Sequence, residues 1–322
     1  MGSVVDKQAS AQVRLVEVTR AEAGQRIDNF LTRYLKGVPR SKIYRILRRG
    51  EVRVNSGRIQ PRYKIKAGDK VRIPPVRIAA EKMQSVPDHA LADIEERIVF
   101  ENTRVLVIDK PTGMAVHGGS GIRHGLIEVL RARRPDAPYL ELVHRLDRAT
   151  SGCLVIAKRR SALRALHEQL RNGQMNKRYL ALVRGRWTGG RRRVTAPLAK
   201  NRLQGGERVV RVDADGKSAE TVFYPVSTHA IASLLEVDLR TGRTHQIRVH
   251  AAHIDCPLAG DARYGDTGFN RTMKTLGLRR LFLHAQLIEF TEPGSGEVLT
   301  VSASLDDELR SVLDNLERQT DD

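Results

Sequence analysis

The stretch HRLDRATSG, residues 144–152, sets one carboxylate, Asp147, between Arg145 and Arg148. Neighbouring guanidinium groups favour the charged form of an acid, and the small polar turn at residues 150–152 can present that acid at a surface. The segment therefore indicates a reactive carboxylate beside cations that suit phosphate. An aspartate between two arginines is more often a structural ion pair on a solvated face, so the rest of the chain has to decide between these interpretations.

The segments on either side of this stretch have the patterns of an α+β fold. Helical periodicity predicts helices over residues 126–133 and 161–171. Apolar runs predict strands at residues 98–100, 105–108, 142–143, 153–157, 179–183, 234–239 and 247–250. Because strands outnumber helices and several lie close enough for hairpin pairing, we expect a central mixed, largely antiparallel sheet. Residues 265–277 are rich in glycine and charge and are expected to form a surface loop.

The N-terminal quarter has the pattern of a separate small unit. Apolar residues at helical spacing predict a helix over residues 25–35, and a second helix is expected to begin with Ser41 as its N-cap and to end at Gly50. Short strands are expected to follow around a turn at residues 56–57. The cations of the second helix recur at steps of three or four, which puts them on one exposed face. We call this face the basic stripe: Lys42, Arg45, Arg48 and Arg49.

The charge balance indicates a polyanionic partner. The chain has 56 Lys and Arg against 37 Asp and Glu, a net charge of +19 with a pI near 10.5. Residues 1–80 hold 19 Lys and Arg against 6 Asp and Glu, a net charge of +13. A strongly basic segment is typical of proteins that bind nucleic acid, so we expect the N-terminal quarter to grip RNA or DNA. The alternative for the basic stripe is a solvated helix without a partner.

Several classes of protein are not indicated by the sequence. Cys153 and Cys256 are the only cysteines and have no CxxC spacing, which suits a reducing cytoplasm and predicts no thiolate metal cluster. No apolar run approaches the ~18 residues of a membrane-spanning helix, and the start of the chain lacks the pattern of a secretory signal. No GxGxxG or GxxxxGK[ST] loop is present, so no nucleotide cofactor is expected.

Four segments of the body, taken together, point to one family. They are DKPTG at 109–113, HRLDRATSG at 144–152, NKRYLALVRG at 176–185 and LRTGRTHQIRVH at 239–250. They closely resemble the RluA family of pseudouridine synthases. The N-terminal order of two helices, RRGEVRVN, an AGD turn and a closing strand resembles the alpha-L RNA-binding module, also called S-four-like. The resemblance implies an alpha-L domain over residues 20–80, a linker over 81–95 and a pseudouridine synthase catalytic domain over 96–310.

The resemblance also implies an activity and the residues that perform it. The expected reaction isomerises specific uridines of large-subunit (23S) ribosomal RNA to pseudouridine, with no cofactor and no metal. Asp147 would be the catalytic aspartate and Arg248 its partner. Tyr179 would pack against the target ring and act as the base or proton relay at C5. Arg145 would enter the space left when the uridine swings out of the stacked RNA.

Other polar residues carry weaker expectations. Arg243 is expected to contact RNA phosphate. His245, His250 and His253 suggest zinc, but their spacing is not HExxH, and strand-like alternation would put His245 and His250 on opposite faces, so no metal site is expected. Many family members have a second aspartate where this chain has Ala149, which suggests different hydrogen bonding around the loop.

Two alternatives to ribosomal RNA modification remain open at this point. The separate basic unit is also consistent with a ribosome assembly factor without enzymatic activity, and some relatives act on transfer RNA. The sequence does not distinguish whether the aspartate attacks covalently or takes a proton from the sugar. The oligomeric state is expected to be monomeric by default.

Overall fold

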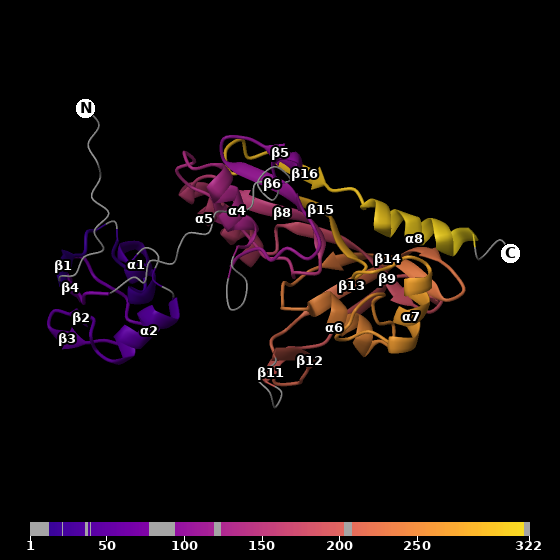
Figure 1. The fold of residues 1–322 in the computed structure, drawn as a ribbon, viewed down its shortest axis with the longest axis horizontal. Helices are drawn as coiled ribbons and strands as arrows, with labels where there is room; N and C mark the ends of the chain where they lie inside the picture. Colours follow the sequence, from indigo (N-terminus) through magenta and orange to yellow (C-terminus); the bar gives the residue numbers. More distant parts are fainter. Residues whose placement is uncertain are drawn as a thin grey trace. The chain divides into compact units, whose positions relative to one another are not determined.

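The computed structural model describes residues 13–20, 22–35, 38, 40–76, 94–118, 124–202 and 208–318. The chain divides into two units, Met1–Ser85 and Val86–Asp322, each with its own apolar core (Figure 1). None of the helices in these ranges is long and apolar enough to cross a membrane.

The N-terminal unit packs two helices against one face of a small antiparallel sheet. Its elements are β1 (Arg14–Glu17), α1 (Ile27–Tyr34), α2 (Arg40–Arg48), β2 (Arg53–Val54), β3 (Gly57–Arg58) and β4 (Lys70–Ile73). The strand order is β1-β4-β2-β3. Phe30 and Leu31 of α1 pack with Ile46 of α2 and with Val54 and Val71 of the sheet, and all five side chains are buried. Burial of this apolar surface is what holds so small a unit together.

Two local expectations for this unit are wrong. Helix α2 begins at Arg40, so Ser41 lies inside its first turn and is not the N-cap. The hairpin turn lies at Asn55 and Ser56, one residue earlier than expected, with φ angles of 49° and 68°. Left-handed backbone at both central residues is what a two-residue hairpin of type I′ requires, and asparagine tolerates it better than most residues.

The second unit contains all the remaining elements. In chain order they are β5 (Ile98–Glu101), β6 (Val105–Lys110), α4 (Leu126–Arg133), β7 (Glu141–Leu142), β8 (Ser151–Ala157), α5 (Arg160–Arg171), β9 (Asn176–Arg184), β10 (Arg192–Thr195), β11 (Leu198–Arg202), β12 (Arg208–Val212), β13 (Glu220–Thr228), β14 (Ala232–Leu239), α6 (Gln246–His253), α7 (Thr267–Thr275), β15 (Leu283–Thr291), β16 (Val298–Ser302) and α8 (Asp307–Arg318). The linker expected over residues 81–95 falls mainly outside the described residues. Ile94, near its end, is buried in the core of this second unit.

A mixed sheet organises this unit, as the sequence predicts. Its path is β10-β13-β14-β9-β15-β8-β6-β5, with β16 on β15 and β7 on β8. Every pair along the path is antiparallel except β15 with β8, which is parallel. β11 and β12 form a separate antiparallel pair. The parallel contact matters for the site because it brings Ser151 and Gly152, at the end of the HRLDRATSG stretch, against β15.

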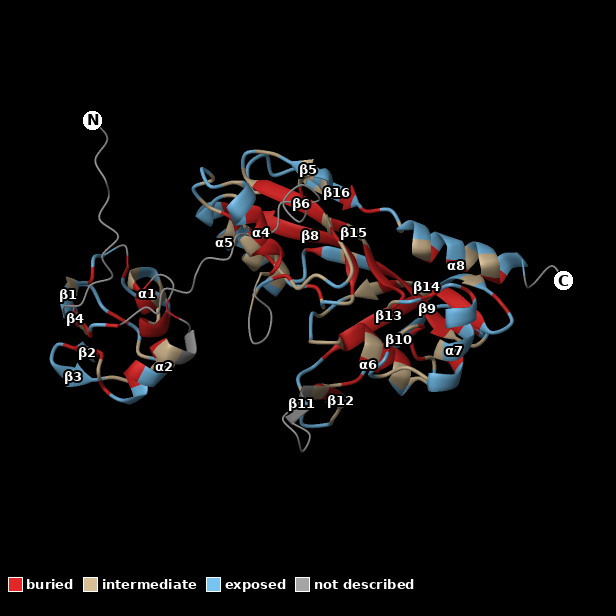
Figure 2. Cartoon of the chain, viewed as in Figure 1, coloured by how far each residue is buried: buried red, intermediate tan, exposed pale blue. Residues whose placement is uncertain are grey.

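Helices cover both faces of this sheet (Figure 2). Leu130 of α4 and Ile247 of α6 pack on one face. On the opposite face Leu166 of α5 packs in a second cluster, and Met273 of α7 packs with Val312 of α8 in a third. All seven residues of β8 are therefore buried, which explains why it has a continuous apolar run in place of alternation.

Two expectations for the second unit are wrong. Residues 247–250 belong to helix α6 and not to a strand. Ile247 and Ala251 pack into the main core, whereas Val249 packs into a separate small cluster. Because two sides of the helix are buried, its apolar residues alternate as they do in a strand. Residues 265–277, expected as a loop, contain helix α7, whose Asp266 caps the N-terminus by accepting a hydrogen bond from the Phe269 backbone N–H at 2.6 Å.

Candidate active site

Asp147 lies on the loop that joins β7 to β8. The loop closes as a turn in which the Thr150 backbone N–H donates to the Asp147 carbonyl at 3.1 Å. It enters β8 at Ser151, and at the next residue, Gly152, φ is +105° and a Cβ atom would lie 2.3 Å from the Ala285 carbonyl oxygen. Only glycine fits there, for both conformational and steric reasons. The turn presents the Asp147 side chain at a 25% exposed position, accessible to a substrate.

The DKPTG segment, residues 109–113, fixes this loop through hydrogen bonds. Lys110 is fully buried, and its Nζ donates to the Arg148 carbonyl at 3.3 Å and to two carbonyl oxygens of its own segment at 2.7 and 2.9 Å. Thr112 Oγ1 donates to the Ala149 carbonyl at 3.0 Å. The Gly113 N–H donates to the Arg148 carbonyl at 2.8 Å, and Arg148 Nε donates back to the Gly113 carbonyl at 2.7 Å. The segment therefore positions the loop, and Arg148 is part of that framework.

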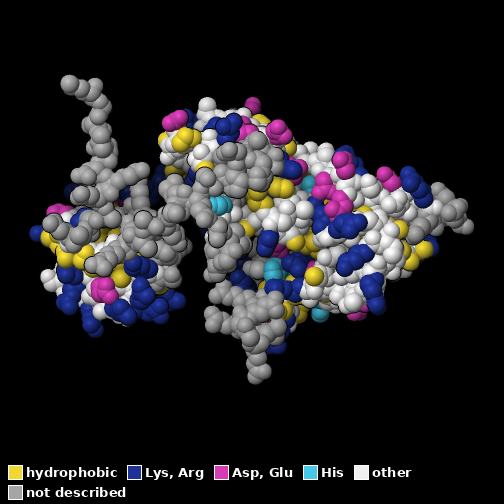
Figure 3. Space-filling view, in the orientation of Figure 1, with side chains coloured by type: hydrophobic (Ala, Val, Ile, Leu, Met, Phe, Trp, Pro, Cys, Tyr) yellow, Lys and Arg dark blue, Asp and Glu magenta, His cyan; other side chains and the backbone are white. Residues whose placement is uncertain are grey.

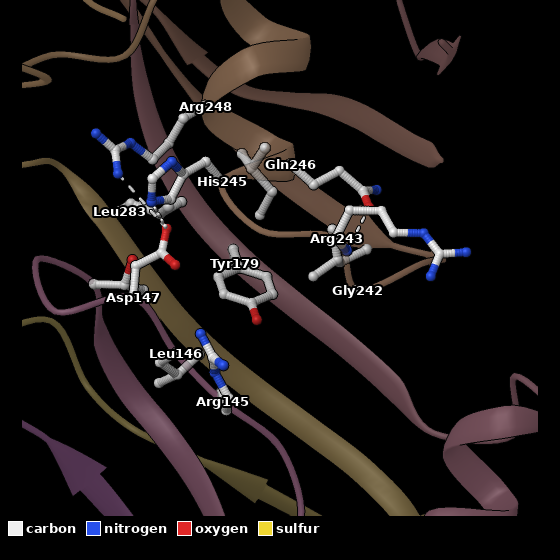
Figure 4. Close-up of a pocket in the computed structure, with 13 residues that line it drawn as sticks. Arg145, Leu146, Asp147, Tyr179, Gly242, Arg243, His245, Gln246, Arg248 and Leu283 are labelled. Atoms are coloured by element: carbon white, nitrogen blue, oxygen red, sulfur yellow. Dashed lines mark hydrogen bonds and ion pairs between the residues drawn. The ribbon is translucent and has the colours of Figure 1, made fainter. Parts of the chain in front are cut away.

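Arg248 of α6, which the resemblance implies as the partner of Asp147, lies near the carboxylate of Asp147. Its Nη1 lies 3.6 Å from Asp147 Oδ2 (Figure 4). Asp261, which no sequence motif indicates, fixes the guanidinium of Arg248: Nε and Nη2 each donate to it at 2.7 Å. Burial acts most strongly and lowers the pKa of Arg248, but the bond to Asp261 and the charges of Asp261 and Asp147 together outweigh it and raise the pKa above its usual value. Arg248 is thus a permanent cation anchored on one acid and directed at another.

His245 is a second neighbour of the same oxygen. Its Nε2 lies 3.8 Å from Asp147 Oδ2. Burial lowers the pKa of His245 and outweighs the opposing attraction of Asp147, while Arg248 lowers it further. A neutral imidazole is therefore favoured near pH 7.

Tyr179 of β9 is the third expected member of the site. It is 5% exposed and lines a cavity of about 80 Å³ together with Asp147 (Figure 4). Burial raises the pKa of Tyr179, and the charge of Asp147 raises it further, so the phenol is neutral at physiological pH. The ring is available for packing, but the phenolate is not available as a free base.

Arg145 and Arg243 lie at the margins of the cavity. Arg145 is exposed, and Figure 4 shows its guanidinium beside the Tyr179 phenol. It also lines two larger hollows of about 590 and 670 Å³ that share Asp147. No described carboxylate lies within 4.0 Å of it. Arg243 donates from Nε to the Ser218 carbonyl at 3.0 Å and points away from Asp147 (Figure 4). Of these two arginines, only Arg145 has its guanidinium beside Tyr179 in the cavity.

The basic stripe belongs to the N-terminal unit. Arg45, Arg48 and Arg49 are exposed, and Lys42 is half-buried. Arg49 follows the last residue of α2 and lies 3.8 Å from Glu51. Figure 3 shows Lys and Arg side chains gathered over the part of this unit that carries α2, β2 and β3. The guanidinium groups of Arg45, Arg48 and Arg49 therefore face solvent, as the cations of a phosphate-binding surface must.

The strand-like alternation expected for these histidines is wrong, because His245 precedes helix α6 and His250 lies within it. His250 is buried, with Nδ1 2.9 Å from Thr221 Oγ1 and Nε2 2.9 Å from the Ala196 carbonyl. His253 is exposed. Within the described ranges, no three His, Cys, Asp or Glu side chains are grouped closely enough to hold a metal ion.

Two residues of the site were not foreseen from the sequence. Asp261 and Tyr264 lie in the segment between α6 and α7, and neither belongs to a recognised motif or a periodic run. Tyr264 packs under Arg248, whose Cζ lies 5.0 Å from the ring centroid, and bonds to His245. No local pattern could have revealed them, because their role comes from contacts across 13 and 19 residues of chain.

Comparison with known families assigns both units. Residues 104–253 match the family described as RNA pseudouridylate synthase, and residues 25–71 match the S4 domain. The first match contains Asp147, Tyr179 and Arg248, and the second contains the whole basic stripe.

Full-length relatives and a solved structure agree with these matches. The "Ribosomal large subunit pseudouridine synthase C" of Escherichia coli (strain K12) is 55% identical over 96% of this chain and 98% of its own length. The protein of the same name from Haemophilus influenzae is 51% identical over 97% of both chains. The solved structure of human RNA pseudouridylate synthase domain containing 4 superposes with a TM-score of 0.60 at 27% identity, covering 71% of this chain and 96% of that one.

Proposed function

The chain belongs to the pseudouridine synthases, a family of RNA isomerases, and from that membership we propose that it converts uridines of large-subunit ribosomal RNA to pseudouridine. The observation that carries the proposal is the convergence of Asp147, Arg248 and Tyr179 on one cavity. The substrate class is suggested by the relatives, whose names specify the ribosomal large subunit.

Asp147 is the proposed catalytic group. The reaction breaks the bond from C1′ to N1, turns the uracil and forms a bond from C1′ to C5. Because the ring gains a proton at N1 and loses one from C5, no electron acceptor or outside group is needed. A carboxylate can attack covalently or can remove a proton from the sugar, and both routes need an ionised, accessible oxygen. The partial exposure of Asp147 and its nearby cation Arg248 support either route.

Tyr179 is proposed to pack against the uracil and to relay the C5 proton. The raised pKa of Tyr179 favours relay over direct abstraction by a phenolate. A neutral phenol can accept a proton only while it passes its own on. Its buried ring gives the uracil a flat apolar surface while the base is turned.

Arg145 is proposed to occupy the space that the uridine leaves. Extruding a base costs a few kcal/mol of stacking, which contacts to the emptied site must offset. A planar guanidinium can stack on bases and bind phosphate at once. The exposed position of Arg145, which lines three hollows that also include Asp147, supports this role, and Arg243 is proposed to contact RNA phosphate at the margin.

The N-terminal unit is proposed to hold the RNA. We propose an S-four-like RNA-binding domain over residues 20–80, a linker over 81–95 and a catalytic domain over 96–310. The net charge of the first segment and the exposed arginines of the basic stripe support electrostatic binding of a structured RNA. We further propose a cytoplasmic location, because ribosomal RNA is cytoplasmic, and catalysis without metal or cofactor, because the isomerisation needs no redox centre or activated donor. A monomer is proposed by default.

The substrate is tested by mapping pseudouridine in both RNA classes from a strain that lacks this gene. We expect sites in large-subunit RNA to revert to uridine, and to return when the gene is restored. Loss of pseudouridine from transfer RNA alone would overturn the proposed substrate. No loss in either class would instead favour an assembly factor.

A further inference from the structure

His245 occupies a backbone conformation that its local sequence does not explain. It precedes α6 with φ 54° and ψ 21°, in the left-handed region that only a few per cent of non-glycine residues adopt, histidine more often than most. Gln246 holds the turn, since its Oε1 accepts from Thr241 Oγ1 at 2.7 Å and from the Arg243 N–H at 3.0 Å. A conformation that costs about 1 kcal/mol or more and is held by its surroundings is a reason to ask what the side chain does.

Tyr264 fixes the ring of His245. Its Oη lies 2.8 Å from His245 Nδ1 and accepts the Val210 backbone N–H at 3.1 Å. Because the oxygen already accepts that N–H, its own hydrogen is available to Nδ1. An imidazole that accepts at Nδ1 carries its proton on Nε2, the nitrogen that faces Asp147. The two rings meet edge to face with centroids 5.6 Å apart, which limits rotation of the imidazole.

The same tyrosine also supports Arg248. The guanidinium lies over its ring, and the Tyr264 backbone N–H donates at 3.0 Å to Asp261, the anchor of Arg248. Tyr264 therefore braces both groups that approach Asp147 Oδ2. In Figure 4 His245 and Arg248 lie on one side of the carboxylate, and its other oxygen lies on the Tyr179 side.

We propose that His245, held in its Nε2–H form by Tyr264, is a positioning residue that fixes Asp147 Oδ2 and so directs the other oxygen at the uridine. This inference rests on the proposed catalytic role of Asp147. The separation of 3.8 Å is longer than a hydrogen bond, so it must shorten when the uridine is bound, as catalytic contacts often do in substrate complexes. Arg248 Nη1, 3.6 Å from Asp147 Oδ2, stabilises the charge of the carboxylate. The N–H of His245 would set the orientation of the carboxylate.

The charges around the imidazole are consistent with a neutral donor. Asp147 and Asp261 favour protonation of His245, whereas burial, Arg248 and Arg263 oppose it, and the pKa of His245 is lowered overall. A second proton would sit on Nδ1 and would oblige Tyr264 Oη to accept two N–H groups and to lose its own acceptor. Acidification would therefore weaken the hydrogen bond by which Tyr264 fixes the imidazole of His245.

The first test reads the tautomer without any substrate. In the full chain labelled with ¹⁵N-histidine, long-range proton–nitrogen spectra near pH 7 should show Nδ1 of His245 as an imine-type nitrogen and Nε2 as a pyrrole-type nitrogen. The signal is assigned by its loss in His245→Gln. Tyr264→Phe, which removes only the hydroxyl, should weaken this preference. A protonated Nδ1 in the wild-type chain at that pH overturns the proposal.

The second test separates positioning from folding. Single-turnover rates on large-subunit RNA should fall by roughly 10- to 100-fold in His245→Ala, since small displacements of a reacting group cost up to about 100-fold. His245→Gln keeps an N–H donor at the equivalent place and should recover part of the rate. RNA affinity should stay unchanged in both, and His253→Gln, at an exposed position of the same helix, should match the wild type.

The outcomes distinguish the inference from the function it rests on. Equal rates in the alanine and glutamine variants would assign His245 a merely structural role. A wild-type chain that makes no pseudouridine would remove the proposed function, whereas the tautomer measurement would still decide whether Tyr264 fixes the ring.

Discussion

Replacing Asp261 with asparagine should destabilise the second unit and misplace Arg248. The carboxylate is fully buried and accepts two 2.7 Å bonds from the guanidinium. Removing one partner of a buried ion pair costs about 3–5 kcal/mol, and because asparagine retains one acceptor we expect about 3 kcal/mol. For a unit of this size, 1 kcal/mol corresponds to roughly 2–4 °C, so the melting temperature should fall by roughly 6–12 °C.

The pH dependence of this effect has a definite sign. Burial acts most strongly and raises the pKa of Asp261. The bonds and charge of Arg248, together with the backbone N–H bonds from Tyr264 and Arg263, outweigh burial and hold the pKa below its usual range. A depressed carboxyl pKa contributes stability that is complete above its unfolded value of about 3.9 and is lost as pH falls through the folded value. The difference between wild type and Asp261→Asn should thus be constant above about pH 5 and narrow in acid.

The assay is thermal denaturation of the full chain, followed by circular dichroism at several pH values, with single-turnover rates measured alongside. The matched control is Asp136→Asn, which removes one exposed carboxylate and should leave both readouts unchanged. A melting temperature for Asp261→Asn within about 2 °C of wild type, the shift that no more than 1 kcal/mol would produce, would refute the argument that Asp261 anchors Arg248.

Three further outcomes are expected. Tyr179→Phe should lower the single-turnover rate by about 100-fold or more without changing RNA affinity, since it removes a proton relay but keeps the ring; an unchanged rate would exclude the relay. Gly152→Ala should cost about 3 kcal/mol or more in urea denaturation, because its Cβ would lie 2.3 Å from a backbone oxygen, whereas Gly190→Ala, with open space around it, should be neutral. Replacing the exposed arginines of the basic stripe with alanine should flatten the salt dependence of RNA binding by up to about three log-log units; an unchanged slope would show that the stripe does not touch RNA. Those arginines are Arg45, Arg48 and Arg49.

Much of the fold could be predicted because its signals are local. The helices at α4 and α5 have clear periodicity, and β6, β8 and β9 contain uninterrupted apolar runs that burial on both faces explains. The sequence predicts no strand at β10, β13, β15 or β16, where apolar and polar residues are mixed. Asp147, Tyr179 and Arg248 could be named because they lie in contiguous motifs.

What the sequence did not reveal depends on contacts between distant segments. Helix α6 was taken for a strand because two of its sides are buried in different clusters. Asp261 and Tyr264 have unremarkable neighbours in the chain, and only the folded structure brings them under Arg248 and His245. His245 was considered as a metal ligand because residue type alone says nothing about which acid it faces.

The most direct measurement is the single-turnover conversion of uridine in purified large-subunit RNA by Asp147→Asn, with RNA affinity measured in parallel. Asparagine preserves the size of the side chain but removes the charge that either chemical route requires. We expect RNA binding at wild-type affinity and no pseudouridine. Conversion at the wild-type rate would contradict the assignment of Asp147 as the catalytic group.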